Sequence, residues 1–236
     1  MKKLTIALAT VLAVLSAGLL GWIFWLEYGL YAIAVWAAML VALPFSSLLH
    51  ELGHMLCGAM CKIKAVPKFK LFGSSSCKII PKTDKNLRRK IMFTACGGLI
   101  INALLFIFGI VALYVDIIPV WLALLVPSNV YLFIMNAMPV EFNAKTDGRI
   151  FWELLSLNDN AKVMLAVLTV QSQVLNGKPI AEVDEQLLFG VPQIIESEES
   201  FIALTELRYE YFKAKGETDK AEQYKARFEE LKKEYL

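Results

Sequence analysis

Histidine and cysteine are scarce in this chain, and their scarcity limits what the protein can be. Only two histidines and four cysteines occur among the 236 residues. The cysteines lack the spacing of a disulfide scaffold and fall in or beside apolar segments: Cys57, Cys61, Cys77 and Cys96. We therefore predict reduced thiols, which excludes a small secreted domain held together by disulfides.

Charged residues are also absent from several long stretches. Apolar residues make up 57% of the chain, whereas soluble domains are about 45–50% apolar. The excess lies in four runs: 4–26, 30–49 (continuing to residue 61), 91–115 and 117–138. About 20 apolar residues are enough to cross a bilayer as a helix, so these runs predict four membrane spans. The first run is too long for the apolar core of a signal peptide, and we expect an uncleaved anchor.

Basic residues are concentrated between the second and third runs. Residues 62–90 contain a single acidic residue, Asp84, and these basic ones: Lys62, Lys64, Lys68, Lys70, Lys78, Lys82, Lys85, Arg88, Arg89 and Lys90. The short loops around Glu27 and Asp116 contain no Lys or Arg. The positive-inside rule then predicts a multi-pass cell-membrane protein with both termini and the basic loop in the cytoplasm. This topology explains the charges, so we expect no nucleic-acid partner.

The tail, residues 150–236, has a different composition. Its apolar segment 161–170 is too short to span a membrane and predicts a soluble helix that ends at Asn176-Gly177. Two amphipathic helices follow from Ser200 and meet at Gly216, an arrangement similar to one tetratricopeptide unit. The tail therefore predicts a soluble helical module that could bind a cytosolic partner.

The two histidines lie in one short motif, His50-Glu51-Leu52-Gly53-His54, near the end of the second run. On a helix, residues four apart lie on the same face, so His50 and His54 can bind one metal ion. Glu51 then lies beside the metal, where it can take a proton from water. Ionisable residues within a span are costly and usually functional. Two imidazoles and a carboxylate favour one zinc ion per chain.

A catalytic zinc site needs a third protein ligand, and no histidine is left to supply it. Cys57 and Cys61 continue the helical face of the histidines, but ligands from one helix crowd the position that water and substrate need. The acidic residues that follow the fourth run, Asp147 and Glu141, are the other candidates.

These motifs resemble those of the site-2 protease family of intramembrane zinc metalloproteases. That family has H-E-x-G-H followed by N-x-x-P and D-G, and this chain has Asn136-Ala137-Met138-Pro139 and then Asp147-Gly148. Gly98 and Asn102 match the family's G-P-x-x-N, with Leu99 at the usual proline position. The resemblance covers about residues 30–150.

The resemblance implies a role for each matching residue. His50, His54 and Asp147 would bind zinc, and Glu51 would be the general base. Asn136 would position the substrate or stabilise the oxyanion, and Asn102 and Gly98 would also belong to the substrate site. The chain departs from the family in two ways: the stretch from Pro139 to Asp147 is longer than in compact members, and there is no room for a PDZ domain.

The sequence therefore predicts an all-α membrane protein with four transmembrane helices, three of which form the catalytic core. Residues 66–80 predict a short cytoplasmic β-hairpin whose edge could pair with an extended substrate. We expect three parts: a membrane anchor (1–28), a metalloprotease core (29–150) and a cytosolic module (151–236).

The predicted function is zinc-dependent hydrolysis of a peptide bond in a membrane-embedded segment of another protein. One alternative is maturation of a secreted signalling or antimicrobial peptide bound at the membrane. Another is a non-catalytic zinc-binding scaffold, although Glu51 would then have no purpose. A transporter is disfavoured because four spans offer no inverted repeat.

Overall fold

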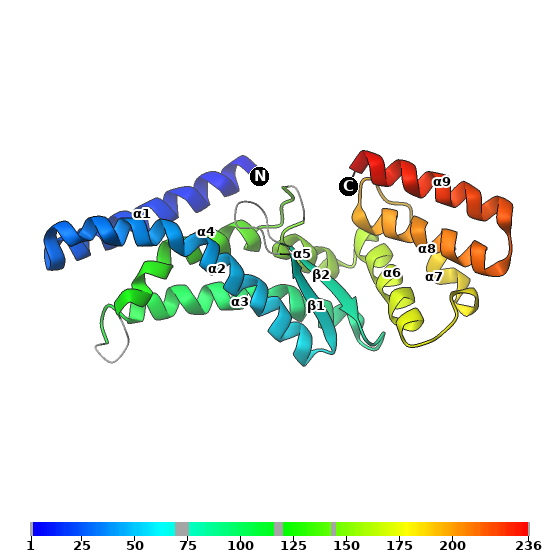
Figure 1. Ribbon diagram of the computed structural model, residues 1–236, viewed down its shortest axis with the longest axis horizontal. Helices are drawn as coiled ribbons and strands as arrows, with labels where there is room; N and C mark the ends of the chain where they lie inside the picture. Colours follow the sequence, from blue (N-terminus) through cyan, green and yellow to red (C-terminus); the bar gives the residue numbers. More distant parts are fainter. Residues whose placement is uncertain (1, 69–75, 116–119, 143–144, 236) are drawn as a thin grey trace. The chain divides into compact units, whose positions relative to one another are not determined.

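A computed structural model describes residues 2–68, 76–115, 120–142 and 145–235 (Figure 1). The chain forms two compact units, one made of residues 1–61, 65–78 and 93–152, and the other of residues 62–64, 79–92 and 153–236. The boundaries predicted at residues 28 and 150 stay a prediction.

The first unit contains most of the apolar helices. Its elements, some of which extend into the second unit, are α1 (Lys2–Tyr28), η1 (Gly29–Tyr31), α2 (Ala32–Met60), β1 (Ile63–Lys68), β2 (Ser76–Pro81), α3 (Leu87–Val111), η2 (Val120–Leu125), α4 (Val126–Ala137) and α5 (Asp147–Ser156). The predicted fold class is confirmed: the described chain is mostly helical, with one two-stranded hairpin.

Within the described part of the chain, four helical segments are long and apolar enough to cross a membrane: Lys2–Glu27, Ala37–Met60, Leu87–Val111 and Val120–Ala137. They coincide with the four runs expected from the sequence and indicate a multi-pass membrane protein. Large apolar side chains such as Leu15, Leu19 and Trp22 remain exposed on α1, as expected of a surface that faces lipid. Pro44 lies within α2, which continues without a break to Met60.

The helices of the first unit pack through apolar side chains and through glycines. Helix α1 lies against α4 and α2, and Leu20, Phe24 and Met39 form a shared core with residues of η2 and α4. Helices α2 and α3 come into backbone contact at Gly53, where an added Cβ would lie 2.4 Å from the carbonyl oxygen of Gly97. The two glycines therefore allow α3 to lie directly against the His50–His54 motif.

The hairpin predicted over residues 66–80 is present as the paired strands β1 and β2. A bond from the Lys82 amide to the Lys62 carbonyl (3.1 Å) extends the pairing beyond the strand ends. The tip of the expected hairpin, residues 69–75, lies outside the described part of the chain.

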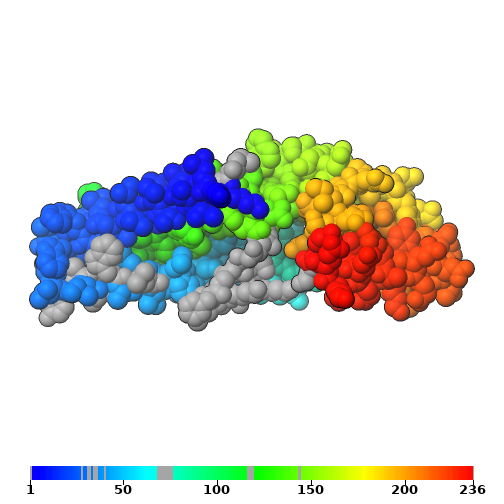
Figure 2. Space-filling model, turned by 90° about the horizontal axis from the view of Figure 1, so that it is seen from above, coloured from blue at the N-terminus to red at the C-terminus, as the bar shows by residue number. Residues whose placement is uncertain are grey.

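The second unit contains the helices of the C-terminal part of the chain. They are α6 (Asp159–Leu175), η3 (Ile180–Glu182), α7 (Glu185–Phe189), α8 (Glu199–Lys215) and α9 (Thr218–Tyr235). Helices α8 and α9 lie side by side, as Figures 1 and 2 show in orange and red. They meet at Gly216, whose φ of 76° is left-handed, so the expected break is confirmed. Tyr211 and Leu188 are fully buried in the core between these helices.

Candidate metal centre

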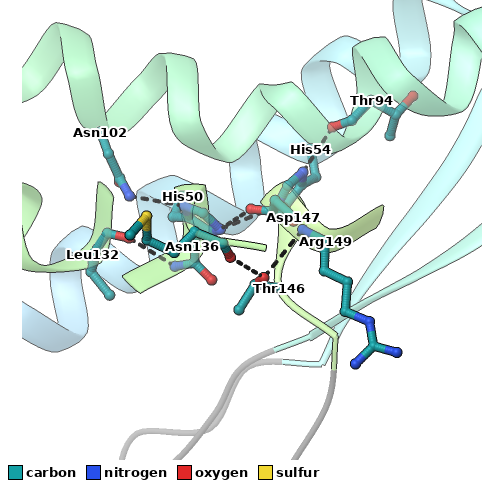
Figure 3. Close-up of polar contacts among 10 residues, drawn as sticks. His50, His54, Thr94, Asn102, Leu132, Asn136, Thr146, Asp147 and Arg149 are labelled. Carbon is teal, nitrogen blue, oxygen red and sulfur yellow. Dashed lines mark hydrogen bonds and ion pairs between the residues drawn. The ribbon is translucent and has the colours of Figure 1, made fainter. Parts of the chain in front are cut away.

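His50 and His54 lie one turn apart on α2, and each residue is only 5% exposed. Their Nε2 atoms are 3.1 Å apart. Asp147, the first residue of α5, completes the group: its Oδ2 lies 3.1 Å from His50 Nε2 and its Oδ1 lies 3.3 Å from His54 Nε2. Figure 3 shows these three side chains converging from two separate helices.

These distances fit a metal centre. Donors that lie 2.0–2.2 Å from a tetrahedral zinc are separated from one another by about 3.3–3.5 Å. The donor atoms of His50, His54 and Asp147 all lie within 4.8 Å of one another, and their closest approaches are 3.1–3.3 Å. No cysteine among the described residues belongs to this group, so Cys57 and Cys61 are not part of it. The geometry therefore supports a buried His-His-Asp metal site.

The carbonyl of Thr94 determines which nitrogen of His54 can bind a metal. It lies 2.8 Å from Nδ1. A carbonyl oxygen can only accept a hydrogen bond, so Nδ1 must carry the proton. In the neutral ring Nε2 then has a free lone pair, and this is the nitrogen that faces Asp147. The Thr94 contact thus selects the metal-binding tautomer.

Asn102 has the corresponding contact with His50. Asn102 is fully buried, and its side-chain nitrogen lies 3.0 Å from His50 Nδ1. Its Oδ1 has no hydrogen-bond partner among the described residues. Oxygen and nitrogen of an amide exchange places on a 180° rotation. In the rotated amide, Oδ1 would accept a hydrogen bond from the Nδ1–H group of His50 and leave Nε2 free for a metal. The orphaned oxygen therefore also fits metal binding.

Glu51 lies in the same turn of α2 and is 4% exposed. Its Oε2 has no hydrogen-bond partner among the described residues. A buried carboxylate oxygen without a partner is rare in native proteins and indicates a site for water or a ligand. Glu51 is therefore available to accept a proton beside the metal-binding group.

The position of Asp147 depends on the loop before it. The Thr146 hydroxyl lies 2.7 Å from the Met138 carbonyl oxygen and 2.8 Å from that of Val140. Burial raises the pKa of the Asp147 carboxyl, but its contacts with the His50 and His54 imidazoles outweigh this effect and hold the pKa below its usual range. Asp147 is therefore an anion, as a metal ligand must be. Nothing in the sequence pointed to Thr146.

Glycines allow two close approaches at the site. A Cβ at Gly148 would lie 2.0 Å from the Ala137 carbonyl oxygen, so only glycine lets α5 begin beside the end of α4. A Cβ at Gly98 would lie 2.3 Å from Cε1 of His50. Gly98 thus provides the space that the His50 ring occupies.

Two other candidates from the sequence lie outside the His-His-Asp group and make other contacts. The Glu141 carboxylate forms an ion pair with Arg149 and is not part of the His-His-Asp group. The Asn136 amide donates to the Leu132 carbonyl (3.0 Å) within its own helix. The substrate-binding roles of Asn136, Asn102 and Gly98 stay predictions.

A second polar cluster within the apolar helices was missed by sequence reasoning. Ser46 lies one turn before His50 on α2, and its Oγ is 2.8 Å from the Ser128 Oγ of α4. The Asn129 amide donates to Ser46 Oγ (2.9 Å). All three residues are buried, and they join α2 to α4. In the sequence they belong to two short polar pairs, Ser46-Ser47 and Ser128-Asn129, within apolar runs.

The described fold and site define a class: a helical, multi-pass membrane protein with a buried His-His-Asp group suited to a metal ion. Comparison with family models, with curated proteins and with solved structures finds no match.

Proposed function

We propose that the protein is an intramembrane zinc endopeptidase, which cuts a membrane-embedded segment of another protein. The convergence of His50, His54 and Asp147 beside the buried carboxylate of Glu51 is the observation that carries this proposal. The HELGH motif by itself needed a third ligand, and a carboxylate from α5 lies at the required distance.

Zinc held by these three residues would supply Lewis acidity toward water and toward a peptide carbonyl. Glu51 takes the proton from the attacking water and later transfers it to the leaving amine. Thr94 and Asn102 keep the two imidazoles oriented through their Nδ1 atoms. Burial of the site keeps the charges of Glu51 and Asp147 in a region of low dielectric, where their interactions are strong.

A peptide bond in a transmembrane helix is protected, because its carbonyl is already hydrogen-bonded, so the substrate must unwind before it is cut. The hairpin β1–β2 offers a strand edge on which an unwound segment could pair. Cys77 of β2 is close enough to the site for the charges of Glu51 and Asp147 to act on it. This proximity supports a substrate strand that runs along the hairpin and past the metal-binding group.

The basic residues of segment 62–90 support an orientation in which this hairpin, the site and both termini lie on the cytoplasmic side. The substrate segment would then be cut near the cytoplasmic end of its span.

Replacement of Glu51 by Gln tests the proposal, since it removes the base and keeps nearly the same volume. Purified wild type and Glu51→Gln are compared for zinc content and for cleavage of a panel of transmembrane peptides. We expect an equal zinc content and a loss of cleavage of at least 100-fold. The control is Glu141→Gln, a nearby carboxylate outside the donor group, which should retain both zinc and activity.

Three results would contradict the proposal. Equal cleavage by Glu51→Gln would remove the general base from the mechanism. Zinc that persists after both His50→Ala and His54→Ala are introduced would show that the ion binds elsewhere. Stoichiometric zinc with no cleavage by wild type, but with capture of a cytosolic protein, would favour the scaffold.

A further inference from the structure

The second unit contains a polar cavity that takes no part in the proposed hydrolysis. It has a volume of about 350 Å³ and is lined by Lys82, Thr83, Asp84, Ser172, Gln173, Asn176 and Lys178. Cavities of about 300–1,000 Å³ are of the size that binds small molecules. The lining comes from two segments, the turn before α3 and the end of α6.

The two segments are joined by direct hydrogen bonds. The Asn176 amide donates to the Lys82 carbonyl (3.1 Å) and also to the Ser172 carbonyl (2.7 Å). The Lys178 amide donates to the Gln173 carbonyl (3.1 Å), which closes the end of α6. The backbone around the cavity is therefore held in place by bonds that do not use its charged groups.

Two buried polar atoms among the lining residues have no hydrogen-bond partner within the described chain. The Ser172 residue is fully buried, yet its hydroxyl has no hydrogen-bond partner among the described residues, and neither has Gln173 Oε1. No ion pair within the described chain engages the ammonium groups of Lys82 and Lys178 or the carboxylate of Asp84. Buried polar atoms without partners are rare and call for a ligand or water.

The charges select one kind of ligand. Two lysines and one aspartate give these lining side chains a net charge of +1, which matches one negative charge. A phosphate diester carries one negative charge, whereas a phosphate monoester carries about −1.5 to −2 at pH 7. The lining also contains the Ser172 hydroxyl and the side-chain oxygens of Gln173 and Asp84. These groups can form hydrogen bonds with hydroxyl groups on the ligand.

The place of the cavity along the chain indicates a source for such a ligand. Lys82, Thr83 and Asp84 come directly before α3, whose apolar segment from Leu87 is long enough to span a membrane. Three residues of the lining thus precede a candidate span directly along the chain, and basic pockets beside spans bind anionic lipids. We propose that the cavity binds a hydroxyl-bearing phosphate diester, the chemistry shared by a glycerol-type phospholipid headgroup and by its soluble counterpart.

The experiment measures binding to the full-length chain in detergent at constant ionic strength. The probes are dihexanoyl phosphatidylglycerol, dihexanoyl phosphatidylcholine, glycerophosphoglycerol and inorganic phosphate. We expect phosphatidylglycerol to bind at least fivefold more tightly than phosphatidylcholine or inorganic phosphate. Glycerophosphoglycerol binding as tightly as the lipid would identify a soluble ligand, and weaker binding would identify the lipid.

Variants separate a site from general attraction to a basic surface. Lys82→Gln with Lys178→Gln should weaken phosphatidylglycerol binding about tenfold. The control pair, Lys64→Gln with Lys85→Gln, removes the same charge from two exposed residues of segment 62–90 that do not line the cavity. It should change phosphatidylglycerol binding less than twofold. Equal losses in the two pairs would overturn the proposal.

Ser172→Ala provides a test that does not depend on charge. Because the Ser172 hydroxyl has no partner within the described chain, its removal should leave the melting temperature unchanged and weaken binding two- to fivefold. Unchanged binding of phosphatidylglycerol to this variant, or no measurable binding to wild type, would refute the site. The proposal does not rest on the protease activity and can be tested on Glu51→Gln protein.

Discussion

Gly98→Ala should separate metal binding from folding. The added Cβ would lie 2.3 Å from Cε1, 2.5 Å from Nε2 and 2.6 Å from Nδ1 of His50. Non-bonded carbon atoms prefer about 3.5–4.0 Å, so the ring has to move by about 1 Å. Metal–ligand distances tolerate only about 0.2 Å. The substitution should therefore detach His50 from the metal, although it adds only one methyl group.

The expected magnitude follows from this displacement. Disturbing residues that merely support a metal ligand costs about 10–100-fold in metal affinity, and Gly98→Ala displaces the ligand itself. We expect zinc affinity to fall at least about 100-fold, which is about 2.8 kcal/mol. Strain from overpacking, about 1–3 kcal/mol, is partly offset by the better helix propensity of alanine, about 0.5–1 kcal/mol.

Zinc affinity is measured by competition with a chelating dye, and folding by thermal unfolding in detergent without zinc. Gly18→Ala in α1 is the control, because a Cβ there has no neighbour within 4 Å. It should leave zinc affinity unchanged. Zinc affinity of Gly98→Ala within threefold of wild type would refute the idea that the His50 ring occupies this space while it holds the metal.

Three further substitutions or measurements test the surroundings of the site. Asn102→Asp should retain zinc, because a carboxylate can accept the hydrogen bond from Nδ1–H of His50. Asn102→Leu cannot accept it and should lose about 10–100-fold in zinc affinity, measured by the same dye competition. Equal zinc affinities of the two variants would exclude this orienting role. Asn129→Leu should lower the free energy of chemical unfolding by about 0.6–1.7 kcal/mol, because Ser46 Oγ loses the hydrogen bond from the Asn129 amide within the apolar helices. A variant more stable than wild type would show that the cluster does not join α2 to α4. Burial, with smaller effects from nearby carboxylates, raises the pKa of the Cys77 thiol to about 12. Alkylation of Cys77 by iodoacetamide, followed by mass spectrometry, should therefore be slow at pH 8 and still accelerate up to pH 10, whereas a plateau near pH 9 would contradict the shift.

The sequence by itself determined the elements that depend on local pattern. The four apolar runs identify the spans, because crossing a membrane requires only enough consecutive apolar residues. The spacing of His50 and His54 places both imidazoles on one face of whichever helix carries them. Gly216 ends a helix because a left-handed residue favours glycine, and the break between α8 and α9 could be predicted for the same reason.

Only the tertiary structure decided which groups meet. Asp147 and Glu141 were equal candidates by residue type, and the fold brings Asp147 to the imidazoles while Glu141 pairs with Arg149. The contacts of Thr94 and Asn102 with the histidines join residues 40 and 52 positions apart. Such contacts have no periodic signal, because they depend on how α2, α3 and α5 pack. The sequence thus determined which segments could carry the chemistry, and packing decided which side chains complete it.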